Sequence, residues 1–425
     1  MTERMTNDEG SSIDRTIKKR LQSSDRLLDF GIRQSSLQSR VIATDARLTE
    51  LVGKIDVAAK VALDTEADSL HAYRERLCLL QISVPVTAIA AIGDAGLPRD
   101  SRKAGAHRQS QVKVHDYIVD PLAGLDLAAL RGSLDAREIV LHGADYDLRL
   151  LRRGLNFSAH RIFDTAIAAR LLGIREFGLA ALVKRYFGVE LGKHSQKANW
   201  GRRPIPTQMQ AYAINDVHYL LPLADRLESQ LQEHSRIDWL RQSCQRTIEQ
   251  AAIDRIRDAD DLWRISGSAQ LQGRPAAVLR ALWHWREQEA EAADRPPFHI
   301  LRNEELLDAA IDFALKKMPD YRHFSVRRRR AFQEAARRAM ELPESEWPVL
   351  RRRFGKRPNS EIIRRAEELR HHRDRAAKEL DLEPSFIASR GALFAIASDS
   401  TRWASLLVPW QRELLGFDTE TPRSD

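Results

Sequence analysis

Residues 61–68 read VALDTEAD, and this stretch decides how the first half of the chain is interpreted. Its apolar run leads directly into Asp64 and Glu66, which predicts a buried strand with two acidic residues at its end. Side chains two positions apart on a strand share a face, so both carboxylates point the same way. Adjacent carboxylates repel unless a cation lies between them, and divalent cations prefer such oxygen ligands. The pair alone leaves two alternatives: a divalent-metal site at the strand end, or ordinary polar residues where the strand ends.

A second acidic position follows a later buried strand. Residues 138–151 read EIVLHGADYDLRLL, which predicts a strand, a turn at Gly143 and then a helix. Asp147 falls in the first helical turn, where its carboxylate can lean back toward the strand end. Asp145 competes for this role, although capping the helix suits it better. We interpret His142, at the strand exit, as a hydrogen-bonded structural residue.

A third motif, YAINDVHYLL, occupies residues 212–221. Tyr212 and Asp216 are four positions apart and therefore share one helix face. A phenol beside a carboxylate can orient a water molecule for attack. The alternative is an ordinary amphipathic helix in which Tyr212 is half buried.

Apolar periodicity predicts a mixed first half and a helical second half, which suggests separate domains. The predicted strands cover residues 60–64, 77–83, 86–92, 117–120 and 138–142. Residues 93–116 are polar and basic and predict a long surface loop. From residue 208 onward the pattern is almost entirely helical. The predicted organisation is a polar extension over residues 1–40, an α/β domain over 41–235, a linker helix and helical domain over 236–320, and a second helical, Arg-rich domain over 321–425.

Composition excludes several protein classes. The chain has 425 residues, of which 43% are hydrophobic and 30% charged, and this is typical of globular proteins. The longest mostly apolar stretch, residues 78–92, is shorter than the roughly 20 residues that a membrane helix needs. The first ten residues are polar, and Cys78 and Cys244 form no CxxC pair. These features predict a cytoplasmic protein without a membrane anchor, disulfide framework or zinc site.

Basic residues concentrate in one window. The whole chain has a net charge of +8, and residues 321–360 alone carry twelve Arg or Lys against four Glu. Clustered arginine is the electrostatic footprint of a polyanionic partner. A solvated helix face is the alternative interpretation.

Taken together, the acidic motifs resemble the DEDD exonuclease superfamily, in the subgroup with Tyr in the third motif. The closer resemblance is to ribonuclease D and its exosome-associated relatives. It is carried by VALDTEADSLHAYRERLCLLQIS, YIVDPL, VLHGADYDLRLL, FDT and YAINDVHYLL, between residues 61 and 221. The resemblance implies a ribonuclease-H-like fold, a mixed sheet flanked by helices.

The resemblance also implies two Mg²⁺ or Mn²⁺ ions and a role for each acidic residue. Asp64 would bridge both ions, and Glu66 and Asp216 would complete the site of the ion that activates water. Asp147 would help to hold the second ion, and Tyr212 would orient the nucleophilic water. Carboxylates suit hard cations, and two such ions stabilise the attacking and leaving oxygens of an in-line displacement. Asp164 in FDT precedes a helical run, and we interpret it as a helix cap.

The loop QKANWGRRPIP, residues 196–206, resembles a family segment that positions the RNA end. Lys197, Trp200 and Arg202 match it, and their predicted roles are phosphate contact and base stacking. An ordinary surface loop is the alternative. The sequence departs from the family pattern at Ala67, Ala198 and Asn199, which puts the fine positioning of the terminal nucleotide in doubt.

The helical half contains two further resemblances. Residues 262–310 resemble the HRDC domain, an auxiliary nucleic-acid-binding module, with a helical apolar stripe behind Pro275. Residues 379–397 resemble the end of a second, more divergent HRDC-like unit. Packing without nucleic-acid contact is the alternative.

The predicted function is therefore a 3′→5′ exoribonuclease that releases nucleoside 5′-monophosphates by two-metal-ion catalysis. Its expected partner is RNA with a free 3′ end, and the resemblance suggests the 3′ maturation of tRNA precursors or small stable RNAs. Two alternatives remain open. The first is a DNA 3′ exonuclease, because such enzymes use the same carboxylate site. The second is a binding protein whose active site is inactive. The presence of all four carboxylates and Tyr212 argues against the latter.

Overall fold

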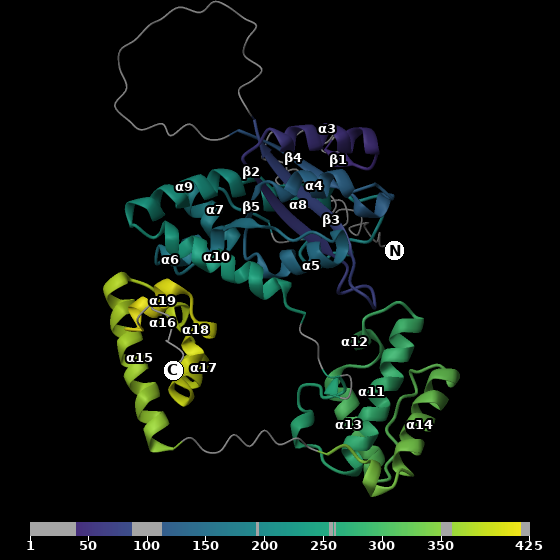
Figure 1. Ribbon diagram of the computed structural model, residues 1–425. Coiled ribbons are helices and arrows are strands. Elements are labelled where there is room, and N and C mark those ends of the chain that lie inside the picture. Colours follow the sequence, from purple (N-terminus) through teal and green to yellow (C-terminus); the bar gives the residue numbers. More distant parts are fainter. Residues whose placement is uncertain are drawn as a thin grey trace, which may run out of the picture. The chain divides into compact units, whose positions relative to one another are not determined.

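The computed structural model describes residues 40–86, 113–192, 195–254, 258, 261–349 and 359–417. The chain divides into two compact units (Figure 1). The first unit contains most of the chain up to residue 244 and holds the sheet. The second contains the helical part from residue 245 onward, together with residues 67–77 and 148–156.

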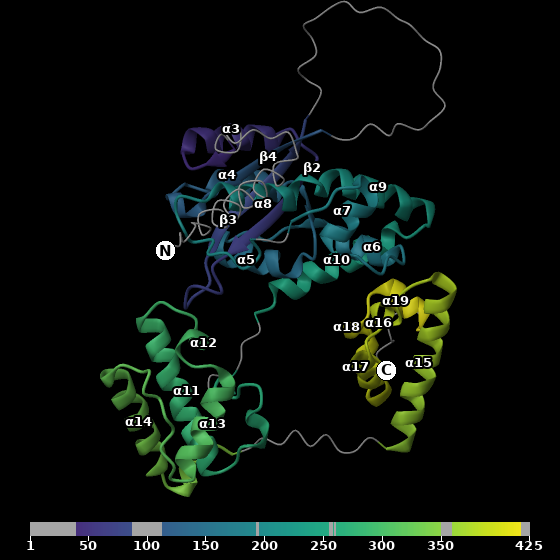
Figure 2. The same cartoon turned by 180° about the vertical axis from the view of Figure 1, so that it is seen from behind.

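A mixed six-stranded sheet with flanking helices forms the first unit (Figures 1 and 2). The strand order is β1-β4-β3-β2-β5-β6. β3 and β4 are antiparallel, whereas β1–β4, β2–β5 and β5–β6 are parallel pairs. The strands are β1 (Val41–Ile42), β2 (Lys60–Ala67), β3 (Leu77–Pro85), β4 (Val114–Val119), β5 (Glu138–Leu141) and β6 (Arg161–Asp164). The predicted α/β fold of the first half is confirmed.

The strands with the clearest apolar runs are the ones that the sequence predicted. In β2, Val61, Ala62 and Leu63 are fully buried, and every residue of β3 except Pro85 is buried. Most of the predicted strand at residues 86–92 lies outside the described residues, as do residues 93–112 of the predicted loop. The end of that predicted loop is wrong, because residues 114–116 belong to β4.

Helices connect and cover the strands of this unit. They are α3 (Asp45–Asp56), α4 (Ala128–Asp135), α5 (Asp145–Leu155), α6 (Thr165–Leu171), α7 (Leu179–Phe187), α8 (Thr207–His218), α9 (Leu220–Glu233) and α10 (Ile237–Ala252), with a 3-10 turn at Pro121–Ala123. Figures 1 and 2 both place α8 beside β3 and β4. Its apolar face packs there through Met209, Ala213 and Ile214, against Leu79 of β3 and Ile118 of β4. This packing fixes the helix that carries Tyr212 and Asp216.

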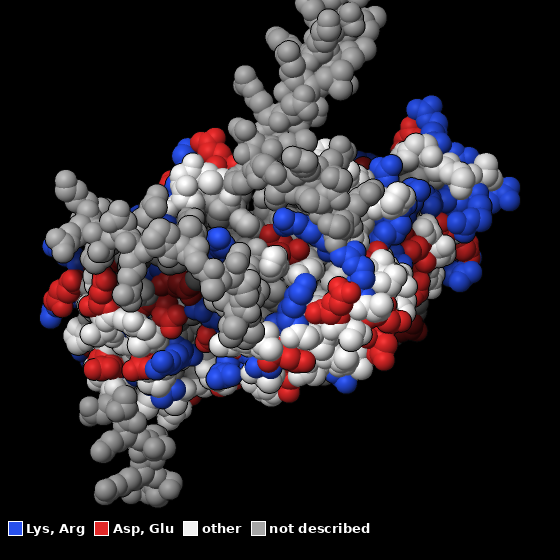
Figure 3. Space-filling view, turned by 90° about the horizontal axis from the view of Figure 1, so that it is seen from above, with Lys and Arg blue, Asp and Glu red and all other residues white. Residues whose placement is uncertain are grey.

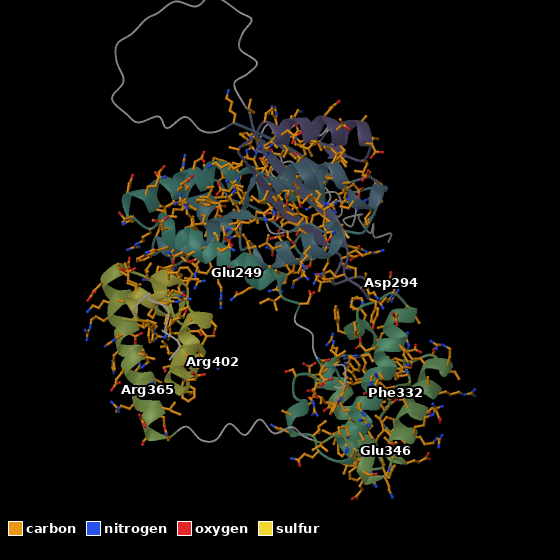
Figure 4. All side chains as sticks on the ribbon, in the orientation of Figure 1. Glu249, Asp294, Phe332, Glu346, Arg365 and Arg402 are labelled. Atoms are coloured by element: carbon orange, nitrogen blue, oxygen red, sulfur yellow. The ribbon has the colours of Figure 1, made fainter. Side chains whose placement is uncertain are left out.

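The second unit contains a bundle made of α11 (Arg274–Ala292), α12 (Pro297–Ile300), α13 (Asn303–Ala314) and α14 (Val326–Met340). Phe332 lies in the interior of this bundle, 1% exposed, in one hydrophobic cluster with Trp285 and Phe324 (Figure 4). The domain boundary predicted between residues 320 and 321 therefore falls inside a single packed core. The 3-10 turns Ser268–Gln270 and Glu344–Glu346 flank the bundle in sequence.

The C-terminal helices form a further group. They are α15 (Ser360–Leu380), α16 (Pro384–Ile387), α17 (Arg390–Ser398), α18 (Trp403–Leu406) and α19 (Pro409–Leu414), with a 3-10 turn at Ser400–Arg402. Trp410 is buried and its ring lies 5.9 Å from that of Phe386. None of the described helices is long and apolar enough to cross a membrane.

Candidate metal centre

Three of the predicted acidic residues come together at one point of the sheet. Asp64 and Glu66 extend from the end of β2, and Asp216 extends from α8. One carboxylate oxygen from each residue lies within 4.8 Å of the other two, which is close enough to hold one metal ion. The convergence arises because Asp64 and Glu66 share one face of β2 and α8 packs on the neighbouring strands.

Asp147 lies in the first turn of α5 and is buried, with 7% of its surface exposed. Its carboxylate accepts a hydrogen bond from the hydroxyl of Thr65, the residue between Asp64 and Glu66 on β2. Sequence reasoning missed Thr65, although its place inside the DTE motif was a signal.

The turn before α5 is held by a separate carboxylate. Asp164, at the end of β6, accepts hydrogen bonds from the backbone N–H groups of Gly143 (3.0 Å) and Ala144 (2.8 Å). Gly143 has φ +74°, a conformation that favours glycine. Asp164 also accepts from the first backbone N–H groups of α6, so its predicted role as a helix cap is confirmed. Asp145 is the first residue of α5.

Burial and neighbouring negative charges raise the pKa of the four predicted metal ligands, Asp64, Glu66, Asp147 and Asp216. Burial raises the pKa of Asp64 well above its ordinary value, and the charges of Asp147, Asp216 and Glu66 add to the effect. Burial, with Asp216 and Asp147, raises the pKa of Glu66 to about 9. Burial raises the pKa of Asp216 to about 7 and that of Asp147 to about 6. Four carboxyl groups held this close cannot all ionise at low cost without a cation.

Tyr212 completes the group on the same face of α8 as Asp216. Its hydroxyl lies close enough to the Asp216 carboxylate for each group to affect the pKa of the other. Burial, followed by the charges of Asp216 and Glu66, raises the pKa of the Tyr212 hydroxyl. The phenol therefore stays protonated near neutral pH, and its oxygen can accept a hydrogen bond from a water molecule.

The structure separates the three predicted RNA-contact residues of the loop. Lys197 and Arg202 have exposed side chains, as phosphate contacts require. Trp200 is 1% exposed and packs against Tyr212, with ring centroids 6.0 Å apart. In this conformation no base can stack on Trp200, because the indole is already covered. Asn199 accepts from the backbone N–H of Gly201, so its departure from the family pattern preserves a turn.

Comparisons with known proteins agree with this geometry. Residues 95–232 match the 3′-5′ exonuclease family model, and residues 276–312 match the HRDC domain model. A ribonuclease D of Sphingobium indicum is 29% identical over 280 residues, which cover 64% of each chain. A ribonuclease D of Gluconacetobacter diazotrophicus is 27% identical over 388 residues, covering 88% of this chain and 90% of that one. The chain is a homologue of ribonuclease D.

The fold of this ribonuclease D homologue also resembles a solved relative. The crystal structure of Escherichia coli RNase D, described as an exoribonuclease involved in structured RNA processing, superposes with a TM-score of 0.61. It is 22% identical in sequence and the match covers 88% of this chain and 96% of that chain. The resemblance predicted from the acidic motifs is therefore confirmed, and so is the HRDC domain. The match spans slightly less than two thirds of the Sphingobium relative.

The family to which the exonuclease match belongs uses divalent metal ions, and the residues present fit them. The donor set consists of carboxylate oxygens alone, which suits a hard cation. Burial and the neighbouring carboxylates raise the pKa of Asp64 and Glu66, so their ionised forms lack a compensating positive charge. A divalent cation would supply that charge.

Proposed function

We propose that this chain is a metal-dependent 3′→5′ exoribonuclease. It hydrolyses RNA from the 3′ end and releases nucleoside 5′-monophosphates. One observation carries the proposal: Asp64, Glu66 and Asp216 converge within metal-binding distance, and the Tyr212 side chain lies beside them on the same face of α8 as Asp216. A plain structural acidic cluster would not need a protonated phenol directed at its edge.

The carboxylates would hold Mg²⁺ or Mn²⁺. Asp64, Glu66 and Asp216 would hold one ion, and Asp147, together with Asp64, would hold a second. Such ions supply Lewis acidity, which lowers the pKa of water and stabilises the attacking and leaving oxygens. Carboxylate ligands suit both metals, so activity with each must be compared directly.

Tyr212 would orient the attacking water. Its hydroxyl lies beside Asp216, and its oxygen can accept a hydrogen bond from water, which would point the water oxygen toward the scissile phosphate. The water oxygen then bonds to phosphorus and the P–O3′ bond breaks. The 3′ oxygen takes up a proton and becomes the new RNA end, while the water proton passes to solvent. The products are a nucleoside 5′-monophosphate and an RNA shorter by one nucleotide.

Lys197 and Arg202 would contact the phosphates near the RNA end, because both side chains are exposed in the loop that precedes α8. The wider surface does not by itself indicate one continuous RNA path. On the face in Figure 3, Lys and Arg side chains are interspersed with Asp and Glu. We propose structured RNAs, such as tRNA precursors, as substrates, since the relatives carry the name ribonuclease D.

The test uses RNA and DNA oligonucleotides of the same sequence, each labelled at the 5′ end. The full chain is incubated with each in Mg²⁺, in Mn²⁺ and in EDTA. The proposal expects a ladder of RNA shortened from the 3′ end, lost in EDTA and in the Asp64→Asn variant. Faster degradation of the DNA would favour a DNA exonuclease instead. No degradation of either polymer with any metal would support a binding protein with an inactive site.

A further inference from the structure

Arg203 uses every hydrogen-bond donor of its guanidinium. Nε and Nη2 donate to the two carboxylate oxygens of Asp120, at 2.7 and 2.6 Å. Nη2 also donates to the backbone carbonyl of Cys78 (2.9 Å). Nη1 donates to the carbonyls of Trp200 (2.7 Å) and Arg202 (2.9 Å). A guanidinium has five N–H groups, and all five are satisfied here.

This residue therefore ties three segments together. Asp120 directly follows β4, and its side chain is only 8% exposed. Cys78 lies in β3, while Trp200 and Arg202 belong to the loop that leads into α8. A partly buried bidentate ion pair with three further backbone bonds fixes the geometry of that loop in a way that a lysine could not reproduce.

The anchored loop contacts Tyr212 and the start of α8, and so constrains the position of Tyr212, in two ways. The Trp200 ring contacts the Tyr212 ring, and Ile205 accepts a hydrogen bond from Gln210 in the first turn of α8 (2.8 Å). The indole N–H of Trp200 is buried and finds no hydrogen-bond partner among the described residues. Arg203 is thus the polar contact that holds the Trp200 segment, and packing holds the ring itself.

The far end of α8 is attached to the same strand. Asp116 of β4 is buried and lies 2.8 Å from Nδ1 of His218, in the last turn of α8. Asp116 also accepts from Ser83 (2.9 Å) and Arg40 (2.9 Å). Asp116, within β4, and Asp120, directly after it, therefore hold the far end of α8 and the loop before its start, on either side of Tyr212 and Asp216.

We propose that Arg203 and Asp120 form a positioning pair that sets the orientation of the Tyr212 hydroxyl in the proposed hydrolysis. Neither side chain belongs to the metal cluster, so the pair acts through Trp200 and the start of α8. This inference rests on the proposed function. It assigns the positioning role in the loop to Arg203. The sequence had singled out the preceding residue, the exposed Arg202, for contact with RNA.

A double-mutant cycle tests the coupling. Arg203→Lys keeps the charge but loses the bidentate fork and most backbone bonds. A misplacement of the attacking group by about 1 Å can cost about 100-fold in rate, so we expect kcat to fall about 10- to 100-fold with KM nearly unchanged. In the Tyr212→Phe background the hydroxyl is already absent, and Arg203→Lys should then lower kcat by less than about threefold. Asp120→Asn serves as a second variant in the same cycle.

Arg137→Lys is the matched control. Arg137 is also partly buried, at 22% against 27% for Arg203; it forms an ion pair with the Asp56 side chain (3.7 Å) and donates a hydrogen bond to the Asp56 backbone carbonyl (2.7 Å). It directly precedes the start of β5, which pairs with the start of β2 and so lies away from Asp64. This variant should share any general loss of stability and leave kcat unchanged.

A second readout does not depend on activity. The chain contains eight tryptophans, and labelling with 5-fluorotryptophan gives a ¹⁹F resonance for each, with Trp200 assigned by Trp200→Phe. Arg203→Lys should shift the Trp200 resonance, whereas Arg137→Lys should leave it in place. An unmoved Trp200 resonance, or an equal fall in kcat with and without the Tyr212 hydroxyl, overturns the proposal. A wild-type chain that degrades no RNA would refute the proposed function, while the ¹⁹F result would still decide whether Arg203 fixes Trp200.

Discussion

Asp64 is the residue on which the proposed metal centre depends most. It lies at the end of β2, within reach of Glu66 and Asp216, and its charge is coupled to Asp147 as well. Asp64 would help to hold the proposed metal ions, and its position between Glu66, Asp216 and Asp147 is shared by none of the other three. The three acidic partners approach it from β2, α5 and α8, so the site forms only when the sheet and both helices are assembled.

Asp64→Asn is expected to abolish turnover without unfolding the chain. The amide has the same shape but cannot supply the bridging negative charge, so activity should fall more than about 1,000-fold, or roughly 4 kcal/mol in barrier. Because one of four repelling carboxyl groups is removed, the metal-free variant should melt at or above the wild-type temperature. Activity within about tenfold of wild type would contradict the metal centre.

Divalent cations are expected to stabilise the chain more strongly as the pH rises. The folded-state pKa values of Asp147, Asp216 and Glu66 are about 6, 7 and 9, all above the ordinary values of about 4. The folded, metal-free chain therefore holds protons that the unfolded chain has released, and its stability falls as the pH rises through these values. Bound cations replace those protons.

The measurement is the gain in Tm when Mn²⁺ is added, at about pH 6 and about pH 8.5, where these pKa values place the change. The gain should be larger at the higher pH. A double variant, Asp64→Asn with Glu66→Gln, provides the control and should lose most of the gain. An equal or smaller gain at high pH in the wild type would show that cations do not bind these carboxylates.

At the scale of elements, the strands and helices with strong apolar periodicity could be predicted from the sequence. Short strands, and features that depend on tertiary contacts, could not. β2 and β3 are long apolar runs and were located from the sequence. β1, of two residues, is too short to show a period. β6 has four residues like β5, but its sequence RIFD has only two apolar residues, whereas β5 carries the apolar run IVL. The loop before α8 carries Trp200 and Arg203, and which of its side chains turn inward depends on contacts with β3 and β4 that no local pattern encodes.

The Arg-rich helix α14 illustrates the same limit. Its density of arginine predicted a nucleic-acid contact, yet four of its arginines have acidic partners. Arg327 and Arg328 both bond Glu289 of α11, and Arg337 and Arg338 both bond Glu334. Part of this charge therefore holds the bundle together or is neutralised locally.

Glu289→Gln is expected to destabilise the bundle. Burial tends to raise the pKa of Glu289, but hydrogen bonds and charge from Arg327 and Arg328 outweigh it and lower that pKa. Losing charge-assisted bonds between α11 and α14 should cost about 1–3 kcal/mol of unfolding free energy. Differential scanning calorimetry of the full chain measures it. Exposed Glu304, which forms no ion pair among the described residues, provides the control as Glu304→Gln. An unchanged bundle transition would show that these bonds contribute nothing.

At the scale of the whole molecule, we expect catalysis and the binding of longer RNA to depend on different parts of the chain. All proposed metal ligands lie in the first unit, and the HRDC match lies in the second. A chain ending at Asp254 should therefore cleave a short single-stranded RNA, but bind longer structured RNA more weakly. Its affinity should also depend less on salt, by about 0.7 in log–log slope for each lost phosphate contact.

The comparison uses RNA affinity at several salt concentrations, with Ca²⁺ in place of Mg²⁺ to suppress cleavage. An Arg329→Ala, Arg330→Ala variant should shift the slope in the same direction by less, because these two arginines form no ion pair among the described residues. Identical slopes for the full chain, the truncation and this variant would show that the helical part does not contact RNA.

The central claim is hydrolysis at a carboxylate-held metal centre, and the most direct test follows the oxygen of the attacking water. RNA is digested in H₂¹⁸O with Mn²⁺, and the released nucleotides are examined by mass spectrometry. The account predicts nucleoside 5′-monophosphates with one ¹⁸O in the phosphate, formed by the wild type and absent with Asp64→Asn. Products without ¹⁸O, nucleoside diphosphates, or unchanged products from Asp64→Asn would contradict it.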